Sequence, residues 1–295
     1  MRKNITFLIV VALLCWALPC GAEWKVSSEK TISGFGHPES VAFDPLAQVL
    51  YVSRFGPDLN PIQKDEMGFI SLIDLNGKML EERFLPGPGG LLNKPKGVWV
   101  NQGLLWTADI DSVWVFDLKT KNGQRVSLPG ANFANDLVAN SGKLFVSDTV
   151  NGTIYAVEPA DFLTAIPKVD PMIRKSGLSP NGLWINNERD LLVGTAPSGD
   201  SAGRIYKLKK QGMIEPISPE LGRIDGLAVL SDGTILYTDW KGKGLFELDK
   251  NGQIRLLAGG FDGPADFAVV SRADGYLIVV PDLVKGDLRF FTINK

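Results

Sequence analysis

Short apolar stretches alternate with polar turns rich in Gly, Asn and Asp along most of this chain, and one short phrase recurs with them. The phrase places two small or polar residues just before an apolar stretch, as in Pro180-Asn181-Gly182-Leu183. A polar break and a second apolar stretch follow, such as Leu144-Phe145-Val146-Ser147. Short stretches of this composition between such turns favour strands over helices. The copies of the phrase begin at Pro38, Pro95, Ala134, Pro180, Ile224 and Pro264.

The spacing of the phrase predicts the architecture. Its third position falls at Ser40, Gly97, Asp136, Gly182, Gly226 and Asp266, in steps of 57, 39, 46, 44 and 40 residues. A period in the forties is typical of repeat proteins. Each repeat has room for about four short strands, which indicates the blade of a β-propeller. We therefore predict an all-β fold, a six-bladed β-propeller.

The two ends of the chain predict how the ring closes. The sixth repeat lacks an outer strand, because the chain stops at Lys295 soon after the apolar segment 288–293. The segment 24–32 precedes the first repeat and has nothing local to pair with. We predict that this N-terminal strand completes the last blade and so hides an open sheet edge. A frayed N-terminus is the alternative.

Residues 1–22 have the layout of a secretory signal peptide. Arg2 and Lys3 precede an uncharged apolar run, which is short for a membrane span, and small residues at 20–22 offer a cleavage site. We expect one propeller domain over 23–295, a periplasmic or secreted location, and no transmembrane segment in the mature chain.

Cys20 leaves lipoprotein anchoring as an alternative, although Leu18 and Pro19 fit a lipoprotein signal poorly. Both cysteines, Cys15 and Cys20, lie in this leader, so the mature chain has no disulfide and no cysteine ligand. With 31 basic against 33 acidic residues and no basic run, nucleic acid is excluded as an expected partner. A single histidine, His37, disfavours a nitrogen-rich or sulfur-rich metal site.

The second position of the phrase carries the candidate chemistry. Sixfold pseudo-symmetry aims these side chains at a common axis, where carboxylate and amide oxygens suit a hard cation such as Ca²⁺. A group of like charges there also needs a cation to offset its repulsion. The alternative is that these residues are only turn formers. The set is Glu39, Lys96, Asn135, Asn181, Asp225 and Ala265.

Two insertions predict a lid over this mouth of the channel. The segments Arg54 to Met67 and Ala196 to Ala202 both follow a second strand, which returns to the face where the phrases begin. An extra segment around 158–170 falls on the opposite face. The aspartates that end other second strands, Asp109, Asp148 and Asp239, are interpreted as turn formers that accept backbone N–H groups.

At these residues the chain resembles the senescence marker protein, gluconolactonase and luciferin-regenerating-enzyme-like family. Its members are six-bladed propellers, related more distantly to paraoxonases and strictosidine synthases. The likeness spans roughly residues 34–293. The family's first blade opens with Glu-x-Pro-x-Trp, and Glu39-Ser40-Val41-Ala42-Phe43 keeps the acid and an aromatic residue but lacks the proline.

The resemblance implies roles for three more residues. The family's Ser-Asn-Gly-Leu phrase, whose Asn binds metal, matches at Asn181. Its Pro-Asp-Gly phrase, whose Asp binds metal and is proposed as catalytic, matches at Asp225. Its substrate-contacting Asn matches at Asn135, but the family's nearby Arg is not evident, because Asn132 and Phe133 stand there.

The sequence therefore predicts a metal-dependent hydrolase, a lactonase or esterase that acts on a small molecule. Ca²⁺ is the expected cofactor, with Zn²⁺ or Mn²⁺ as alternatives, held by Glu39, Asn181 and Asp225, and Asp225 is the expected general base. Substrate binding is assigned to Asn135, Lys96 and Arg54. The main alternative is a non-catalytic propeller of the cell envelope that binds a ligand or protein, and a lyase or condensation reaction is a further one.

Overall fold

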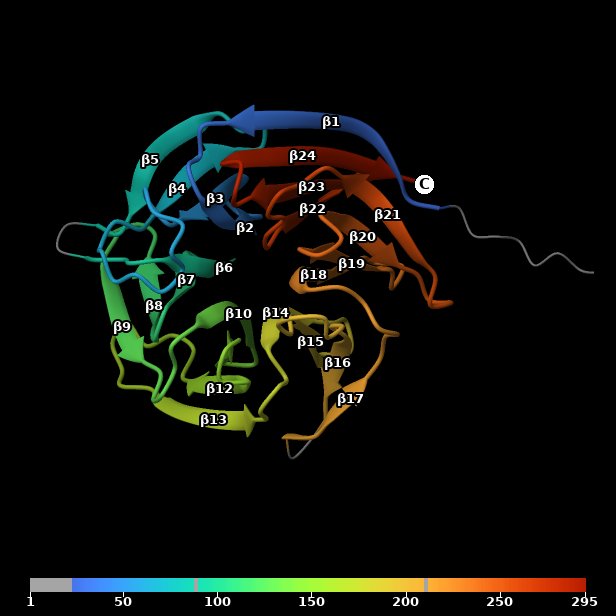
Figure 1. Cartoon of the computed structure of the whole chain (residues 1–295). Coiled ribbons are helices and arrows are strands. Elements are labelled where there is room, and N and C mark those ends of the chain that lie inside the picture. The colour runs from blue at the N-terminus through green and yellow to red at the C-terminus, as the bar shows by residue number, and fades with distance from the viewer. Residues whose placement is uncertain (1–22, 88–89, 210–211) are drawn as a thin grey trace, which may run out of the picture.

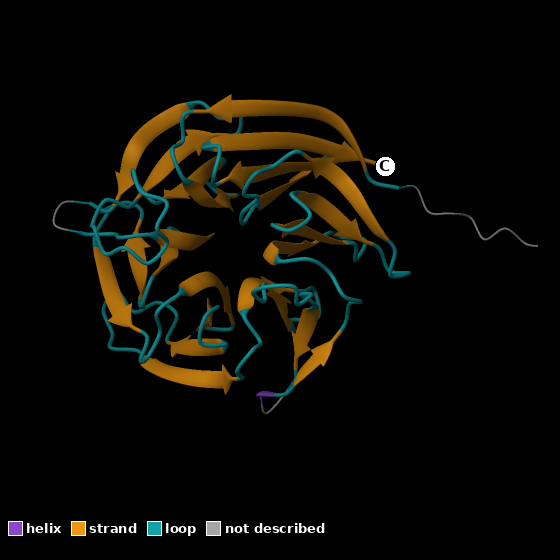
Figure 2. Cartoon of the chain, viewed as in Figure 1, coloured by secondary structure: helices purple, strands orange, loops and turns teal. Residues whose placement is uncertain are grey.

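The computed structural model describes residues 23–87, 90–209 and 212–295, so the leader expected over 1–22 lies outside the described residues. Six four-stranded antiparallel sheets stand around a ring, as Figure 1 shows. Strands and loops make up nearly all of the drawn chain (Figure 2). The predicted all-β six-bladed propeller is confirmed. Within the described ranges, no helix has the length and apolar character needed to cross a membrane.

Each blade, numbered one to six in chain order, has four strands from the channel outward. The innermost strands are β2 (Pro38–Asp44), β6 (Pro95–Asn101), β10 (Ala134–Asn140), β14 (Pro180–Ile185), β18 (Ile224–Val229) and β22 (Ala268–Arg272). The second strands are β3 (Val49–Arg54), β7 (Leu104–Asp109), β11 (Lys143–Asp148), β15 (Leu191–Thr195), β19 (Ile235–Asp239) and β23 (Gly275–Asp282). The third strands are β4 (Phe69–Asp74), β8 (Ser112–Asp117), β12 (Thr153–Glu158), β16 (Ile205–Leu208), β20 (Gly244–Leu248) and β24 (Asp287–Asn294). The outermost strands are β5 (Met79–Leu85), β9 (Gly123–Ser127), β13 (Lys168–Arg174), β17 (Ile214–Pro216), β21 (Ile254–Gly259) and β1 (Lys25–Ser33).

The recurring phrase opens the innermost strand in blades one to five, and the second strand returns antiparallel to it. In blade six the phrase lies just before β22, where Pro264 forms an isolated bridge with Asp282. The phrases and the loops after the second strands therefore share one mouth of the channel. The innermost and second strands are mostly buried, because neighbouring blades pack their apolar faces against each other.

The third position of the phrase joins neighbouring blades at the channel wall. Ser40 Oγ donates to Asp266 Oδ2 at 2.6 Å, which connects blade one to blade six. Leu183 N donates to Asp136 Oδ2 at 2.5 Å, which connects blade four to blade three. Blades two and three approach each other so closely that Gly97 has no room for a side chain. A Cβ added there would lie 2.5 Å from Asp136 Oδ1.

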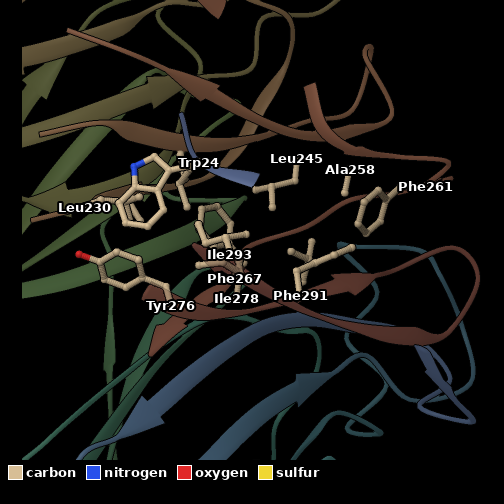
Figure 3. Packing of buried hydrophobic residues seen from close by; sticks show 13 residues of the cluster. Trp24, Leu230, Leu245, Ala258, Phe261, Phe267, Tyr276, Ile278, Phe291 and Ile293 are labelled. Carbon is tan, nitrogen blue, oxygen red and sulfur yellow. The ribbon is translucent and has the colours of Figure 1, made fainter. Parts of the chain in front are cut away.

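The ring closes as predicted, through the N-terminal strand. β1 pairs antiparallel with β24, from Lys25 opposite Asn294 to Ser33 opposite Asp287. Trp24, just ahead of β1, packs edge-on against Tyr276 of β23 with ring centroids 5.2 Å apart. Both belong to an apolar cluster between blades five and six, shown in Figure 3.

Candidate functional site

A cavity of about 390 Å³ opens at the mouth where the phrases begin. Five of the six second-position side chains line it, each from the start of a different innermost strand. They are Glu39, Lys96, Asn135, Asn181 and Asp225. The sixth, Ala265, is buried outside the lining. The repeat therefore brings the predicted carboxylates, amides and lysine together.

Two oxygen atoms of this group are buried without a hydrogen-bond partner. They are Glu39 Oε2 and Asn181 Oδ1, on side chains that are only 5% and 6% exposed. A buried polar atom without a partner is costly, and such atoms are uncommon in folded proteins. Both atoms are acceptors at the same cavity, which is what a bound cation requires.

The electrostatics of the two carboxylates follow from their burial. Burial, reinforced by the charge of Asp225, raises the pKa of Glu39 well above its usual range. Burial also raises the pKa of Asp225 to about 7, although its hydrogen bond with Trp240 acts in the opposite direction. Trp240 Nε1 donates that bond to Asp225 Oδ2. A positive ligand would offset the cost of ionising both groups in this cavity.

Lys96 is buried beside them and faces the lid. Its Nζ donates to the carbonyl oxygens of Pro61 at 2.9 Å and Lys94 at 3.3 Å. The ammonium also lies 4.8 Å from the ring centroid of Phe133 and 5.4 Å from that of Phe55. Burial lowers the pKa of Lys96 to about 8, and the positive charge of Lys94 acts in the same direction.

Asn135 is held by a short relay of hydrogen bonds. Its Nδ2 donates to Thr149 Oγ1 at 3.0 Å, and Thr149 Oγ1 donates to the Pro180 carbonyl at 2.8 Å. This relay fixes the amide by its nitrogen end. Among the described residues, Asn135 Oδ1 has no hydrogen-bond donor, so it is available as an acceptor at the cavity.

The last residue of each second strand holds the adjoining loops. Asp109 accepts from the backbone N–H of Lys94, Asp239 from that of Arg223, and Asp282 from that of Gly263. Asp148 accepts from Asn132 N and from the side chain of Asn151. Each acceptor carboxylate fixes the loop just before the first strand of its own blade. Asp109, Asp148 and Asp239 are turn-forming residues, as expected.

Arg54 occupies the same position in blade one, and the structure does not bring it to the cavity. Its Nε donates to the Phe35 carbonyl at 2.6 Å and its Nη2 to the Gly34 carbonyl at 3.4 Å. The guanidinium also lies over the Phe69 ring, 4.7 Å from its centroid. The expectation that Arg54 binds substrate therefore has no geometric support. Where aspartates accept from loop N–H groups, Arg54 donates to loop carbonyls.

The lid predicted over 54–67 does lie at this mouth. Phe55, Leu59 and Pro61 line the cavity. The fully buried Lys94 fixes the segment, because its Nζ donates to the carbonyls of Phe55 at 2.9 Å and Asp58 at 3.1 Å and pairs with Asp65 at 2.6 Å. The second insertion contributes Ala196 to the lining.

Several lining residues were not singled out from the sequence, although two of them, Phe55 and Ala196, belong to the predicted lid segments. Most of them directly follow a second strand, a position that recurs in register with the phrase. That position supplies Phe55, Thr149, Ala196, Trp240 and Leu283. Phe133 and Arg223, which come just before innermost strands, add an aromatic ring and a cation, and Val284 follows Leu283 in the lining.

The side chains at this cavity can supply three oxygen ligands to a hard cation only if an amide is one of them. Among the described residues, no three His, Cys, Asp or Glu side chains group closely enough to hold a metal ion. Two carboxylates with the Asn181 amide remain, and two of their oxygens are the unpartnered acceptors described above. Carboxylate and amide oxygens suit Ca²⁺. His37 is not among the lining residues, and its Nδ1 lies 3.1 Å from the Leu283 carbonyl.

Comparison with known proteins supports the fold. No family model and no curated protein matches the chain. Among solved structures, a provisionally assigned gluconolactonase has a TM-score of 0.63 at 18% identity, covering 94% of this chain and 93% of that one. A virginiamycin B lyase from Staphylococcus aureus has a TM-score of 0.61 at 13% identity, covering 92% of this chain and 99% of that one.

A third match comes from a protein assembly, the nidogen/laminin complex. It has a TM-score of 0.58 at 15% identity and covers 76% of this chain and 81% of that one. The TM-scores show a shared fold and distant structural kinship with gluconolactonase-like and lyase proteins. They do not transfer an activity, because one fold carries many unrelated functions.

Proposed function

We propose that this protein is a metal-dependent hydrolase of small lactones or esters, with Glu39, Asn181 and Asp225 as the ligands of a divalent cation. Ca²⁺ fits the all-oxygen donor set best, and Zn²⁺ and Mn²⁺ are the alternatives to test. The observation that carries the proposal is the pair of buried, unpartnered acceptors, Glu39 Oε2 and Asn181 Oδ1, in a cavity that Asp225 also lines.

The chemistry needs a polarised carbonyl, an activated water and a fixed substrate. A divalent cation bound there supplies Lewis acidity toward a carbonyl oxygen. Trp240 fixes Asp225 through Oδ2, and Oδ1 has no hydrogen-bond partner among the described residues. Asp225 accepts a proton from water through the oxygen that does not bind the cation. Asn135 orients the substrate, and Lys96 contacts the carboxylate of the product, a role that requires its bond with Pro61 to yield.

The metal part is tested by thermal unfolding of the chelator-treated protein with and without Ca²⁺, Mn²⁺ or Zn²⁺. A ligand at about a hundredfold excess over Kd stabilises the native state by about 2.7 kcal/mol, which raises Tm by a few degrees in a domain of this size. Glu39→Gln and Asn181→Ala should abolish most of that rise. Glu39→Gln should not destabilise the metal-free protein, because a neutral amide replaces a carboxyl whose neutral form burial already favours.

The matched control is Glu188→Gln, whose side chain is 74% exposed and pairs with Lys207 at the surface. It should keep the full metal-induced rise in Tm. If all three cations leave the wild-type melting curve unchanged, the phrase residues are turn formers and the proposed metal-dependent hydrolase is ruled out.

The catalytic part is tested by hydrolysis of a panel of lactones and aryl esters with the active cation. Asp225→Asn should lower kcat by at least about a hundredfold, the usual contribution of a general base. Asp274→Asn, an exposed carboxylate outside the cavity, should keep wild-type kcat. Turnover that survives in Asp225→Asn would remove Asp225 from the mechanism.

A non-catalytic binding propeller is the second candidate. The apolar residues around the cavity and the similarity to a chain of the nidogen/laminin complex favour it. Binding at this mouth without turnover of any panel member would select it. Localisation in the cell envelope stays part of this proposal.

A further inference from the structure

The cavity is divided into a polar floor and an apolar wall. The floor comes from the second-position side chains at the starts of the innermost strands. The wall comes mainly from the loops above them. Its apolar members are Phe55, Leu59, Pro61, Ala196, Trp240 and Leu283, with Phe133 and Val284 beside them.

The wall continues outward as an uncovered apolar rim. Leu59 is 39% exposed and Val284 is 43% exposed, although both line the cavity. Ile62 directly follows the lining residue Pro61, and Val150 directly follows the lining residue Thr149. Both are also largely exposed. Apolar side chains gathered at a cavity mouth commonly mark a ligand-binding surface, since binding removes them from water.

A sugar lactone does not match this wall. Its ring carries several hydroxyl groups, and each one placed against Phe55, Leu59 or Leu283 would lose its water without gaining a protein partner. A ligand with a hydrocarbon substituent gains from the same surface. The polar floor meanwhile gathers its acceptors and a buried ammonium at the starts of the innermost strands, and Thr149 and Arg223 are the other polar lining residues.

We infer that this cavity selects an amphiphilic lactone or ester that carries a hydrocarbon chain. The lactone or ester group rests on the proposed function, whereas the hydrocarbon chain rests on the wall alone. The carbonyl end lies at the floor among Glu39, Asn135 and Asp225. The chain runs outward between the lid segment 54–67 and Leu283 and Val284.

The test measures binding separately from turnover. Isothermal titration calorimetry of the full mature chain with Ca²⁺ uses γ-lactams that carry alkyl chains of increasing length. These lactams keep the ring and the carbonyl of γ-lactones but resist hydrolysis. The dissociation constant should fall by about threefold to fourfold per added methylene until the wall is covered. A polyhydroxylated lactam of the sugar series should bind more weakly than the shortest alkyl lactam.

Two double variants isolate the wall. In the double variant Leu59→Ser with Val284→Ser, the dissociation constant should fall by only about twofold or less per added methylene. The matched control is Leu46→Ser with Ile166→Ser, two side chains that are 76% and 95% exposed and lie outside this cavity. The control should keep the wild-type gain per methylene.

The outcomes separate the two proposals. Any of three results would overturn the ligand class. The first is an affinity that does not depend on chain length, and the second is tighter binding of the sugar-series lactam. The third is a wall variant whose dissociation constant still falls as much per methylene as that of the wild type. Hydrolysis of sugar lactones combined with any of these results would leave the hydrolase standing. Chain-length-dependent binding without hydrolysis of the corresponding γ-lactones would leave the ligand class standing and remove the hydrolase.

Discussion

At the scale of single residues, one position of the repeat uses opposite charges for the same purpose. The last residue of the second strand is an aspartate in four blades and Arg54 in blade one. Each aspartate accepts from backbone N–H groups of a neighbouring loop, whereas Arg54 donates to backbone carbonyls of residues 34–35. The loop in blade one therefore presents its carbonyls inward, and only a donor side chain satisfies them.

Arg54→Met should destabilise the protein and leave ligand binding intact. The change removes two donors from backbone carbonyls and a cation from the face of Phe69, so we expect a loss of about 2–4 kcal/mol in the free energy of unfolding. Urea denaturation measures the loss, and lactam calorimetry checks the cavity. Arg83→Met is the control, because Arg83 is exposed and stacks on the same Phe69 ring.

That control should cost less than about 1 kcal/mol, as expected for an exposed cation on an aromatic ring. If Arg54→Met abolishes lactam binding with unchanged stability, the original assignment of Arg54 to substrate binding is restored.

The sequence locates the phrase residues well because the repeat fixes where their side chains begin and the side chains are mostly short. Glu39, Asn181 and Asp225 reach the cavity for that reason. Arg54 is long, so its position in the strand does not determine where its guanidinium ends. Trp240 and Leu283 could have been found, since the residue after each second strand recurs in register with the phrase.

At the scale of elements, a buried charge holds the lid in place. Lys94 is fully buried, and its ammonium contacts two lid carbonyls and the Asp65 carboxylate. A buried ammonium is stable only when it is paired and hydrogen-bonded, so the lid and the lysine depend on each other. Lys96 adds a fourth contact, to Pro61.

Lys94→Met should release the lid without unfolding the ring. Methionine keeps an unbranched apolar side chain but removes three hydrogen-bonded contacts, so the lid should open more often. Limited proteolysis read by mass spectrometry should show cleavage within 56–67 at least about tenfold faster, since losing about 1.4 kcal/mol of local stability gives a tenfold change. Circular dichroism should stay that of the wild-type propeller.

Lys64→Met is the control, because Lys64 lies in the same lid but is exposed and pairs with Asp111 at the surface. Its cleavage rate should change less than about threefold. Equal cleavage rates in Lys94→Met and Lys64→Met would show that the lid is held by other contacts.

The strands were predictable as elements, because alternation and turn residues report local structure directly. Even the closing strand was placed within one residue, over 24–32 against the observed β1 at Lys25–Ser33. The lid was predictable as an insertion, but its anchor was not. Lys94 precedes the phrase of blade two, and no local pattern shows that its side chain crosses to blade one.

At the scale of the whole molecule, Asp232 of blade five contacts both Trp24, just ahead of β1, and Lys295, just after β24. Its carboxylate accepts from Trp24 Nε1 at 3.0 Å and pairs with Lys295 Nζ at 2.6 Å. Burial alone would raise the pKa of Asp232, but the hydrogen bonds from Lys295, Thr234 and Trp24 outweigh it and lower the pKa to about 2. The ionised form is therefore favoured by the folded ring.

Acid should weaken this closure. A folded pKa of about 2 against an ordinary 3.8 means that the stabilisation is complete above about pH 4 and disappears as the pH falls toward 2. Asp232→Asn should therefore cost about 1–2 kcal/mol at pH 7 and almost nothing at pH 2, since the site is partly exposed. Urea denaturation at both pH values measures the difference.

The control is Asp274→Asn, an exposed carboxylate on the same blade as β1. Its stability should follow that of the wild type at both pH values. A cost of Asp232→Asn that is the same at pH 7 and pH 2 would show that the ionised carboxylate is not what stabilises the closure.

Pairing β1 with β24 also sets an order of events during synthesis. β1 is the first strand of the ring to be made, and its partner is the last, separated by about 260 residues along the chain. Blades one to five can each form from consecutive strands as they emerge, but blade six cannot be completed until the final residues are available. Until then, the apolar face that later receives Trp24 and Phe291 is left uncovered, and such faces invite aggregation. A nascent chain of this protein therefore stays vulnerable until its last strand has been made.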